Sequence, residues 1–322
     1  MNWQPGISRQ VLERRAQFLA SIRQFFKERD ILEVETPLLS HSTNPHPFVP
    51  SLIAEYQPHP DVPPTACYLQ TSPEFAMKRL LAMGSGSIYQ LCKAFRNDFC
   101  GKLHNPEFTM LEWYHVGYDH HQLMDEVDAF LKCMLHVPPA ERVSYQALFQ
   151  QHLNTDPLTV ETAELKKIIE QQGIEVAIAD SELDKDGWLN LAMSHLIEPK
   201  LGKTRPVFVY DYPASQAALA KISSHDARLA ERFEVYYQGI ELGNGFHELS
   251  NENEQRKRFK QQLKERERQE LPIVPLDENF LKALEHGLPD CAGIAIGIDR
   301  LLMIALKKWN IRDVMGFDFD RS

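Results

Sequence analysis

The stretch that decides the fold is FRNDFCGKLHNPEFTMLEWY, residues 95–114. It predicts a strand ending near Arg96, a turn that carries Lys102 and His104, and a return strand rich in acidic and aromatic residues. A guanidinium can hold an α-phosphate through two parallel hydrogen bonds, turn cations can reach the outer phosphates, and a ring such as that of Phe108 can stack on adenine. An ordinary hairpin with a charged turn is the alternative. The length of the pattern favours a nucleoside triphosphate site.

A second constellation is ERFEVYYQGIELGNGFHEL, residues 231–249. A two-residue turn at Gln238-Gly239 would place Tyr236 opposite Glu241, and alternation along the strand would put Glu234 on the same face. The two carboxylates would then lie diagonally, roughly 7 to 8 Å apart at the backbone, with room for Mg²⁺ between them. The alternative is a pair of exposed acids directed into water.

The glycines of ELGNGF disfavour that alternative, because Gly243 and Gly245 permit close backbone approach to a ligand beside Asn244. A third stretch, AGIAIGIDRLLMIALKK at 292–308, predicts a strand that enters a helix with Arg300 near its first turn. This position suits an anionic phosphate or stacking on adenine.

Composition predicts a soluble globular enzyme in one domain spanning 1–322, with 143–205 as a helix-rich connecting insertion. Hydrophobic residues make up 43% of the 322 residues and charged residues 25%, and the net charge is −10. That charge has the wrong sign for a protein that wraps a polyanion. Apolar runs are too short to span a bilayer and no secretory signal is evident, so we expect a cytoplasmic protein. Five cysteines without a C-x-x-C pair indicate mostly buried, reduced thiols.

Local patterns predict several further elements. Helical spacing of apolar residues begins after Ser8, a plausible N-cap, and a strand is expected over 31–37. Residues 41–66 are expected to form a long loop, and 68–84 a short strand, a turn and a helix with Ser72 as a candidate N-cap. Alternating charges over 256–269 are typical of a solvated helix with ion pairs four residues apart.

Taken in order, 8–37, 95–114 and 292–308 resemble motifs 1, 2 and 3 of the class II aminoacyl-tRNA synthetases, in particular the lysyl branch. The resemblance covers essentially the entire chain. It implies an α+β fold in which helices flank an antiparallel sheet. Because the chain begins directly at motif 1, we expect no anticodon-binding OB domain, which lysyl synthetases have. It also implies a homodimer, because motif 1 builds the dimer interface in that family.

The resemblance further implies sites for ATP, for lysine and for Mg²⁺. Arg96 and Arg300 would be catalytic, because both would neutralise charge at the reacting phosphate. The residues implied for ATP are Arg96, Asn97, Asp98, Lys102, His104, Asn105, Phe108, Glu241, Leu242, Gly297 and Arg300. Those implied for the lysine substrate are Ser72, Pro73, Glu74, Glu112, Tyr114, Asn244, Phe246, Glu248 and Ala295. Those implied for Mg²⁺ are Glu234 and Glu241.

Several departures from lysyl synthetases change the expected acceptor. The chain begins directly at motif 1, Ala295 stands where the family usually has glycine, and YPASQAALAKIS at 212–223 differs from the synthetase segment. With HNPEFTMLEWY and GFHEL, these traits resemble truncated lysyl-synthetase paralogues that attach (R)-β-lysine or lysine to a lysine side chain of elongation factor P. Leu103 precedes His104 where lysyl synthetases have an arginine, so Lys102 is the expected substitute cation.

Two other functions remain open on the sequence. A stand-alone enzyme that lysylates tRNA shares the same chemistry, but the charge of −10 disfavours it. A non-catalytic regulatory paralogue is disfavoured by the presence of Arg96, Glu234, Glu241 and Arg300.

Overall fold

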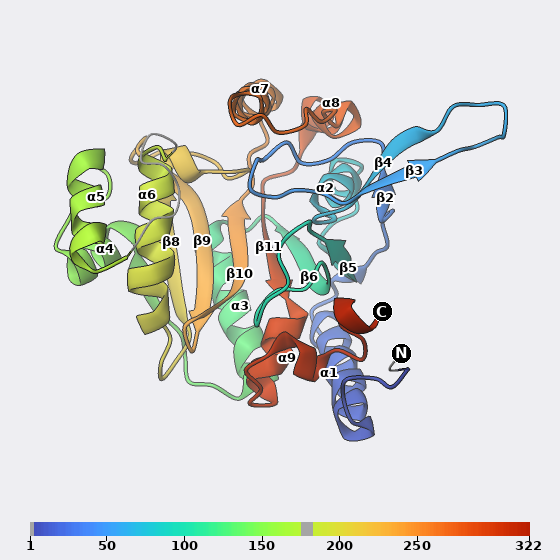
Figure 1. The fold of residues 1–322 in the computed structure, drawn as a ribbon, viewed down its shortest axis with the longest axis horizontal. Helices are drawn as coiled ribbons and strands as arrows, with labels where there is room; N and C mark the ends of the chain where they lie inside the picture. Colours follow the sequence, from blue (N-terminus) through green and yellow to red (C-terminus); the bar gives the residue numbers. More distant parts are fainter. Residues whose placement is uncertain (1–2, 175–182) are drawn as a thin grey trace. The chain divides into compact units, whose positions relative to one another are not determined.

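The computed structural model describes residues 3–174 and 183–322, which form two compact units (Figure 1). Unit 1 takes in the described residues of 1–118, 133–135 and 249–322, and unit 2 those of 119–132 and 136–248. Residues 175–182 of the predicted insertion lie outside the described residues. The single catalytic domain stays a prediction.

Unit 1 has four strands in the order β1-β5-β6-β11 and a small antiparallel sheet in the order β2-β4-β3. Strand β1 is parallel to β5, while β5, β6 and β11 are antiparallel. Its elements are α1 (Arg9–Lys27), β1 (Leu32–Glu33), β2 (Leu39–Ser40), β3 (Ile53–Tyr56), β4 (Thr65–Leu69), α2 (Glu74–Ala82), β5 (Ile88–Phe95), β6 (Glu107–Val116), α7 (Glu252–Arg268), α8 (Glu278–Gly287), β11 (Cys291–Gly297), α9 (Ile298–Ala305) and the 3₁₀ turns Ile311–Val314 and Phe319–Arg321.

Helix α1 begins as predicted, with Ser8 as its N-cap. It packs on one face of unit 1's main sheet, where the Phe26 ring stacks on Tyr89 with centroids 4.3 Å apart and meets Trp113 edge-on. Arg15 donates to the buried Asp299 at 2.7 Å and thereby ties α1 to the first turn of α9. This face of β6 is therefore core, and Phe108, Glu112 and Tyr114 lie on the opposite face.

Three sequence predictions in unit 1 are corrected. The strand expected over 31–37 is limited to Leu32–Glu33, since the chain then leaves β5 and pairs as β2 with β4. The loop expected over 41–66 contains β3 and the start of β4. The five cysteines are free, but only Cys67 and Cys291 are buried, while Cys100 and Cys133 are exposed.

Unit 2 has four strands in the order β10-β9-β8-β7, of which β7 is parallel to β8 and the rest are antiparallel. Its elements are α3 (His120–Leu135), β7 (Glu141–Ser144), α4 (Tyr145–Leu153), α5 (Thr162–Gln171), α6 (Lys185–Ala192), a π turn (Met193–Ile197), a 3₁₀ turn (Glu198–Lys200), β8 (Val207–Pro213), a 3₁₀ turn (Ala214–Gln216), β9 (Leu229–Tyr237) and β10 (Ile240–His247).

The helices of the predicted insertion, α4, α5 and α6, form a hydrophobic core with one face of unit 2's strands. Trp188, Phe149 and Tyr236 lie within this core, and each is at most 1% exposed. Helix α3 begins with a capping box at Asp119, and its first turn lies against β8 and β10 through ring contacts of His121 with Tyr210 and of His120 with His247.

The prediction of an α+β fold built on antiparallel strands is confirmed, as is the helix expected over 256–269. That helix is α7, which ends one residue earlier, at Arg268, and carries the ion pairs Arg256–Glu252 and Arg258–Glu254. Among the described residues, no helix is long and apolar enough to cross a membrane.

Candidate active site

The hairpin of β5 and β6 places the predicted phosphate ligands of unit 1. Arg96 follows the last residue of β5, and its backbone N–H donates to the Pro106 carbonyl at 2.9 Å, which closes the base of the turn. The guanidinium carbon lies 5.4 Å from the centroid of the Phe108 ring. The cation predicted for the α-phosphate and the ring predicted for adenine are therefore neighbours.

The turn between these strands presents polar side chains to solvent. Asn97, Asp98 and Lys102 are exposed. Asn105 is committed to the backbone, since its side chain donates to the Glu107 carbonyl at 2.7 Å and accepts from the Phe319 N–H at 3.0 Å. Asn105 thus shapes the turn.

Arg300 reaches the same turn from the first helical turn of α9, which Gly297 precedes as the N-cap residue. Its guanidinium donates to the Leu103 carbonyl at 3.2 Å and lies 2.7 Å from Nε2 of His104. Partial burial lowers the pKa of His104, and the charge of Arg300 lowers it further. His104 therefore accepts from Arg300 as a neutral ring. Arg300 and His104 thus meet at the turn where an anion would bind.

The predicted lysine pocket of unit 1 centres on Glu112 in β6, which is 2% exposed. One carboxylate oxygen accepts from the Ser72 hydroxyl and the other from the Tyr114 hydroxyl, both at 2.6 Å. Ser72 also accepts from the Glu74 backbone N–H at 3.0 Å, just before α2, although the N-cap position itself is Pro73. Four predicted substrate residues are thereby brought together.

A buried ion pair stands beside Glu112. Lys78, one helical turn after Glu74 in α2, is 0% exposed, and its ammonium lies 2.6 Å from a Glu74 carboxylate oxygen. Burial, and after it the negative charge of Glu74, raise the pKa of Glu112 to about 7. The trio of Glu74, Glu112 and Lys78 contains two acids and one base, so a further cation would stabilise the ionised Glu112.

Ala295, which the resemblance implied for the lysine substrate, lies in β11. On the antiparallel pair β6 and β11, it is directly opposite Glu112. Side chains at such positions share a face with their Cβ atoms about 5 Å apart. Ala295 is only partly buried, so its methyl group faces the same space as the Glu112 carboxylate.

In unit 2, the predicted acidic hairpin is confirmed. Gln238 and Gly239 form the two-residue turn with φ of +56° and +75°, the geometry of a type I′ turn. Glu241 pairs with Tyr236 and Asn244 with Glu234. A β-bulge around Leu242 keeps Glu241, Asn244 and Glu234 on one face, because the extra residue restores the alternation.

The carboxylate of Glu234 is enclosed by donors. Arg232 and the hydroxyls of Tyr212 and Tyr236 all donate to it. Burial raises the pKa of both tyrosines well above the ordinary value, and the charge of Glu234 raises it further, so both hydroxyls keep their protons. Because Oε2 already accepts from both tyrosine hydroxyls, a metal ion would bind Glu234 through Oε1, which accepts from Arg232. The partly exposed Glu241 fits a metal ligand better.

The other predicted substrate residues of unit 2 follow along β10. Asn244 accepts from the Arg232 guanidinium at 3.1 Å, Phe246 is 9% exposed, and Glu248 is 2% exposed. By alternation these three share the face of Glu234 and Glu241.

Sequence reasoning missed two cations, Lys78 and Arg232. Both stand at spacings that could have revealed them. Lys78 is four residues after Glu74 on one helix face, and Arg232 is two residues before Glu234 on one strand face.

Comparisons with known proteins identify the family of this chain. The family described as tRNA synthetases class II (D, K and N) matches residues 4–321. The elongation factor P–(R)-β-lysine ligase of Vibrio cholerae is 51% identical over 321 residues, which cover 100% of this chain and 99% of that protein. The ligase of the same name from Pectobacterium carotovorum is 48% identical, with 100% and 98% covered. That from Pseudoalteromonas translucida is 49% identical, with 99% and 98% covered. The chain therefore belongs to the class II tRNA synthetase family (D, K and N).

Proposed function

We propose that this protein is an ATP-dependent ligase that activates (R)-β-lysine, or lysine, as an adenylate and transfers it to a lysine side chain of elongation factor P. Relatives that carry this activity in their names match the chain over its whole length. The family activates amino acids with ATP, and the site residues of both units fit that chemistry.

The observation that carries the proposal is the buried trio of Glu74, Glu112 and Lys78. Its unbalanced negative charge suits a substrate ammonium group, which would displace the proton that Glu112 otherwise holds near neutral pH. Glu248, an acid implied for the substrate by the resemblance, is buried in unit 2. An uncharged amino-acid side chain would leave Glu112 without a counter-charge, because Lys78 pairs with Glu74.

Activation consists of attack by the substrate carboxylate on the α-phosphorus of ATP, which forms the aminoacyl adenylate and releases pyrophosphate. Arg96 and Arg300 would neutralise the charge that develops on the phosphates. Phe108 offers the ring face for adenine, and His104 and Lys102 offer donors from the turn. These roles are proposals that rest on the positions described above.

Mg²⁺ is the ion we propose for the phosphates. Glu241 is its candidate protein ligand and Glu234 a second candidate, through the oxygen that accepts from Arg232. The ion would neutralise phosphate charge. The hydrogen bond from Arg232 orients the Glu234 carboxylate in its absence.

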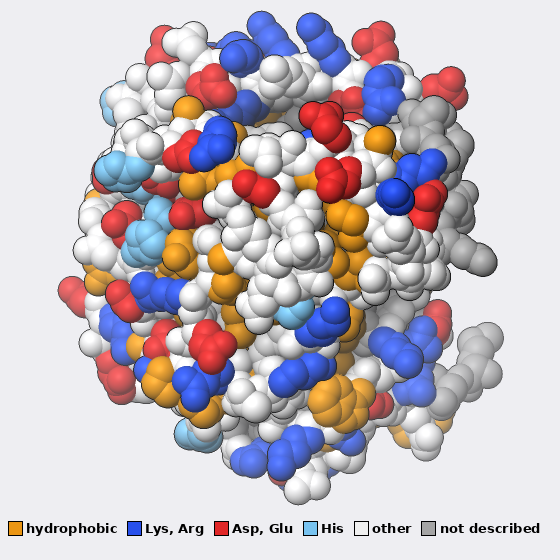
Figure 2. All heavy atoms as spheres, turned by 90° about the vertical axis from the view of Figure 1, so that its left-hand side faces the viewer, with side chains coloured by type: hydrophobic (Ala, Val, Ile, Leu, Met, Phe, Trp, Pro, Cys, Tyr) orange, Lys and Arg blue, Asp and Glu red, His pale blue; other side chains and the backbone are white. Residues whose placement is uncertain are grey.

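In the transfer step, the neutral ε-amine of the acceptor lysine attacks the carbonyl carbon of the adenylate. An amide forms and AMP leaves, while the amine proton passes to a base or to solvent. The chain needs no covalent nucleophile of its own. On the face shown in Figure 2, both Lys and Arg side chains and Asp and Glu side chains are exposed. The net charge of −10 supports a protein acceptor over tRNA. We also propose a homodimer in the cytoplasm.

ATP–pyrophosphate exchange tests the activation step. (R)-β-Lysine and lysine should each support exchange, whereas aspartate and asparagine, the substrates of the sister branches of the family, should not. Exchange with aspartate but with neither lysine isomer would overturn the assignment of the acidic trio.

A further inference from the structure

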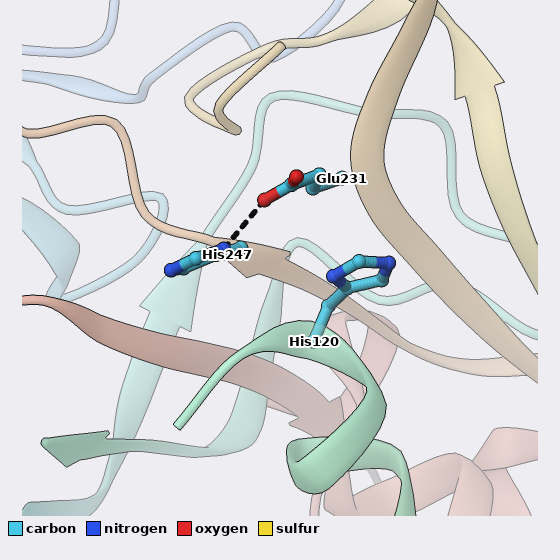
Figure 3. A group of neighbouring side chains, drawn as sticks. All are labelled: His120, Glu231 and His247. Atoms are coloured by element: carbon cyan, nitrogen blue, oxygen red, sulfur yellow. Dashed lines mark hydrogen bonds and ion pairs between the residues drawn. The ribbon is translucent and has the colours of Figure 1, made fainter. Parts of the chain in front are cut away.

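A cluster of metal-ligating side chains stands in unit 2 apart from the candidate active site. His120 opens α3, Glu231 is in β9, and His247 ends β10 (Figure 3). Each offers one ligand atom, and these three atoms lie within 4.8 Å of one another. Elements distant in the sequence therefore bring two imidazoles and a carboxylate together.

The cluster lies on the opposite face of β9 and β10 from the residues proposed for Mg²⁺ and substrate. Phe246 pairs with Arg232, so the next residues of the two strands, His247 and Glu231, point the other way. They face α3, whereas Glu234 and Glu241 do not. The cluster is therefore separate from the residues proposed for Mg²⁺ and the phosphates.

The surroundings of His120 in α3 also indicate a cation site. His120 is 6% exposed, and neither ring nitrogen has a hydrogen-bond partner in the part of the chain that the structure describes. A carboxylate oxygen of Asp211, at a bulge in β8, lies 3.7 Å from its Nε2, beyond hydrogen-bond distance. A buried imidazole with no partner is costly, and a bound cation would satisfy it.

The hydrogen-bond partners of His247 show what must change when a metal ion binds. Nδ1 of His247 interacts with the Glu231 carboxylate, and Nε2 lies 2.9 Å from the ammonium of Lys221. An ammonium can only donate, so without a metal Nε2 accepts and Nδ1 carries the proton. A cation at Nδ1 would replace that proton, and Lys221 would withdraw on its flexible stem while Nε2 takes up a proton.

We propose that His120, Glu231 and His247 form a binding site for Zn²⁺ or a similar borderline divalent cation, with Asp211 as the candidate fourth ligand. Imidazole nitrogens and one carboxylate suit such ions, whereas Mg²⁺ prefers an all-oxygen shell. The ion would cross-link the first turn of α3 to β9 and β10. Its role is thus structural, within unit 2.

The test is metal binding by the full chain, freed of metal with a chelator, without ATP. Titration with Zn²⁺ against a competing chromophoric chelator should show one tight site per chain. His120→Ala and His247→Ala should each weaken binding by at least about 100-fold, and Glu231→Gln by about tenfold, since even indirect contacts to a metal are worth 10- to 100-fold. His121→Ala, one position along the same helix, is the matched control and should bind like the wild type.

Two further measurements test whether the metal ion binds at this site. Zn²⁺ should raise the Tm of the wild type and of His121→Ala but not of His120→Ala, and His120→Gln replaces the latter if the alanine variant does not fold. Co²⁺ in the site should give an absorption spectrum without a thiolate charge-transfer band, which excludes the free cysteines. A chain that binds no Zn²⁺, unchanged affinity in both histidine variants, or a thiolate band would each overturn the proposal.

Discussion

Glu112→Gln should stabilise the protein and impair its substrate binding at the same time. A rise in the pKa of the Glu112 carboxyl from its ordinary 4.5 to about 7 corresponds to about 3 kcal/mol. The folded state binds this proton more tightly than the unfolded chain does. The free energy of unfolding of the wild type therefore falls by about that amount as the pH rises from about 4.5 to about 7.

Glutamine carries no charge to bury, so the variant should escape this loss. The amide accepts less well from the Ser72 and Tyr114 hydroxyls, which costs about 1 kcal/mol of stability. At about pH 8 the variant should therefore be about 2 kcal/mol more stable than the wild type. At about pH 4.5, where the wild-type carboxyl holds its proton, the two should differ by under about 1 kcal/mol. Urea unfolding at both pH values measures the difference.

The same substitution removes a negative charge from the proposed ammonium site. Affinity for lysine should fall by roughly 10- to 100-fold, the worth of one charged hydrogen bond, as measured by calorimetry at about pH 8. Glu107→Gln is the control, because Glu107 lies on the same strand, is 50% exposed and pairs with Lys93. Glu107→Gln should change the free energy of unfolding and the free energy of lysine binding by under about 1 kcal/mol each. A stability difference for Glu112→Gln that does not change with pH would refute the reasoning.

Three other substitutions test the remaining residues. Arg96→Ala should lower pyrophosphate exchange on the order of 10² to 10³-fold with the fold intact by circular dichroism; near-normal exchange would remove Arg96 from the mechanism. Glu241→Gln should show a defect that extra Mg²⁺ partly restores, and normal activity at every Mg²⁺ concentration would show that it is no metal ligand. Ala295→Gly should shift the ratio of efficiencies towards α-lysine by about one to two powers of ten, because the methyl group opposite Glu112 crowds an α-amino group. An unchanged ratio for the two lysine isomers would exclude this role.

The parts that sequence predicted well depend on local patterns. The β5–β6 hairpin and the turn at Gln238-Gly239 follow from alternation and from turn residues, so even the pairing of Tyr236 with Glu241 could be predicted. The N-cap at Ser8 is equally local. Short strands such as Ile53–Tyr56 were missed, because proline and histidine around them mask a pairing that only the partner strand specifies.

The parts that sequence could not predict depend on contacts between distant residues. The donors around Glu234 include Tyr212, which is 22 residues away, and Ser72 meets Glu112 across 40 residues. The surroundings of a carboxylate decide whether it binds a metal, a cation or a proton, and these surroundings emerge only on folding. His120 is buried beside Glu231 and His247, from which it is distant in the sequence.

The central claim is that the activated amino acid goes to a protein. The most direct measurement incubates the protein with ATP, Mg²⁺ and (R)-β-lysine, together with either unmodified elongation factor P or tRNA specific for lysine, and follows each acceptor by mass spectrometry or acid gel. The account predicts one added β-lysyl group on elongation factor P, on a lysine side chain, and no aminoacylated tRNA. Charged tRNA with unmodified elongation factor P would contradict it.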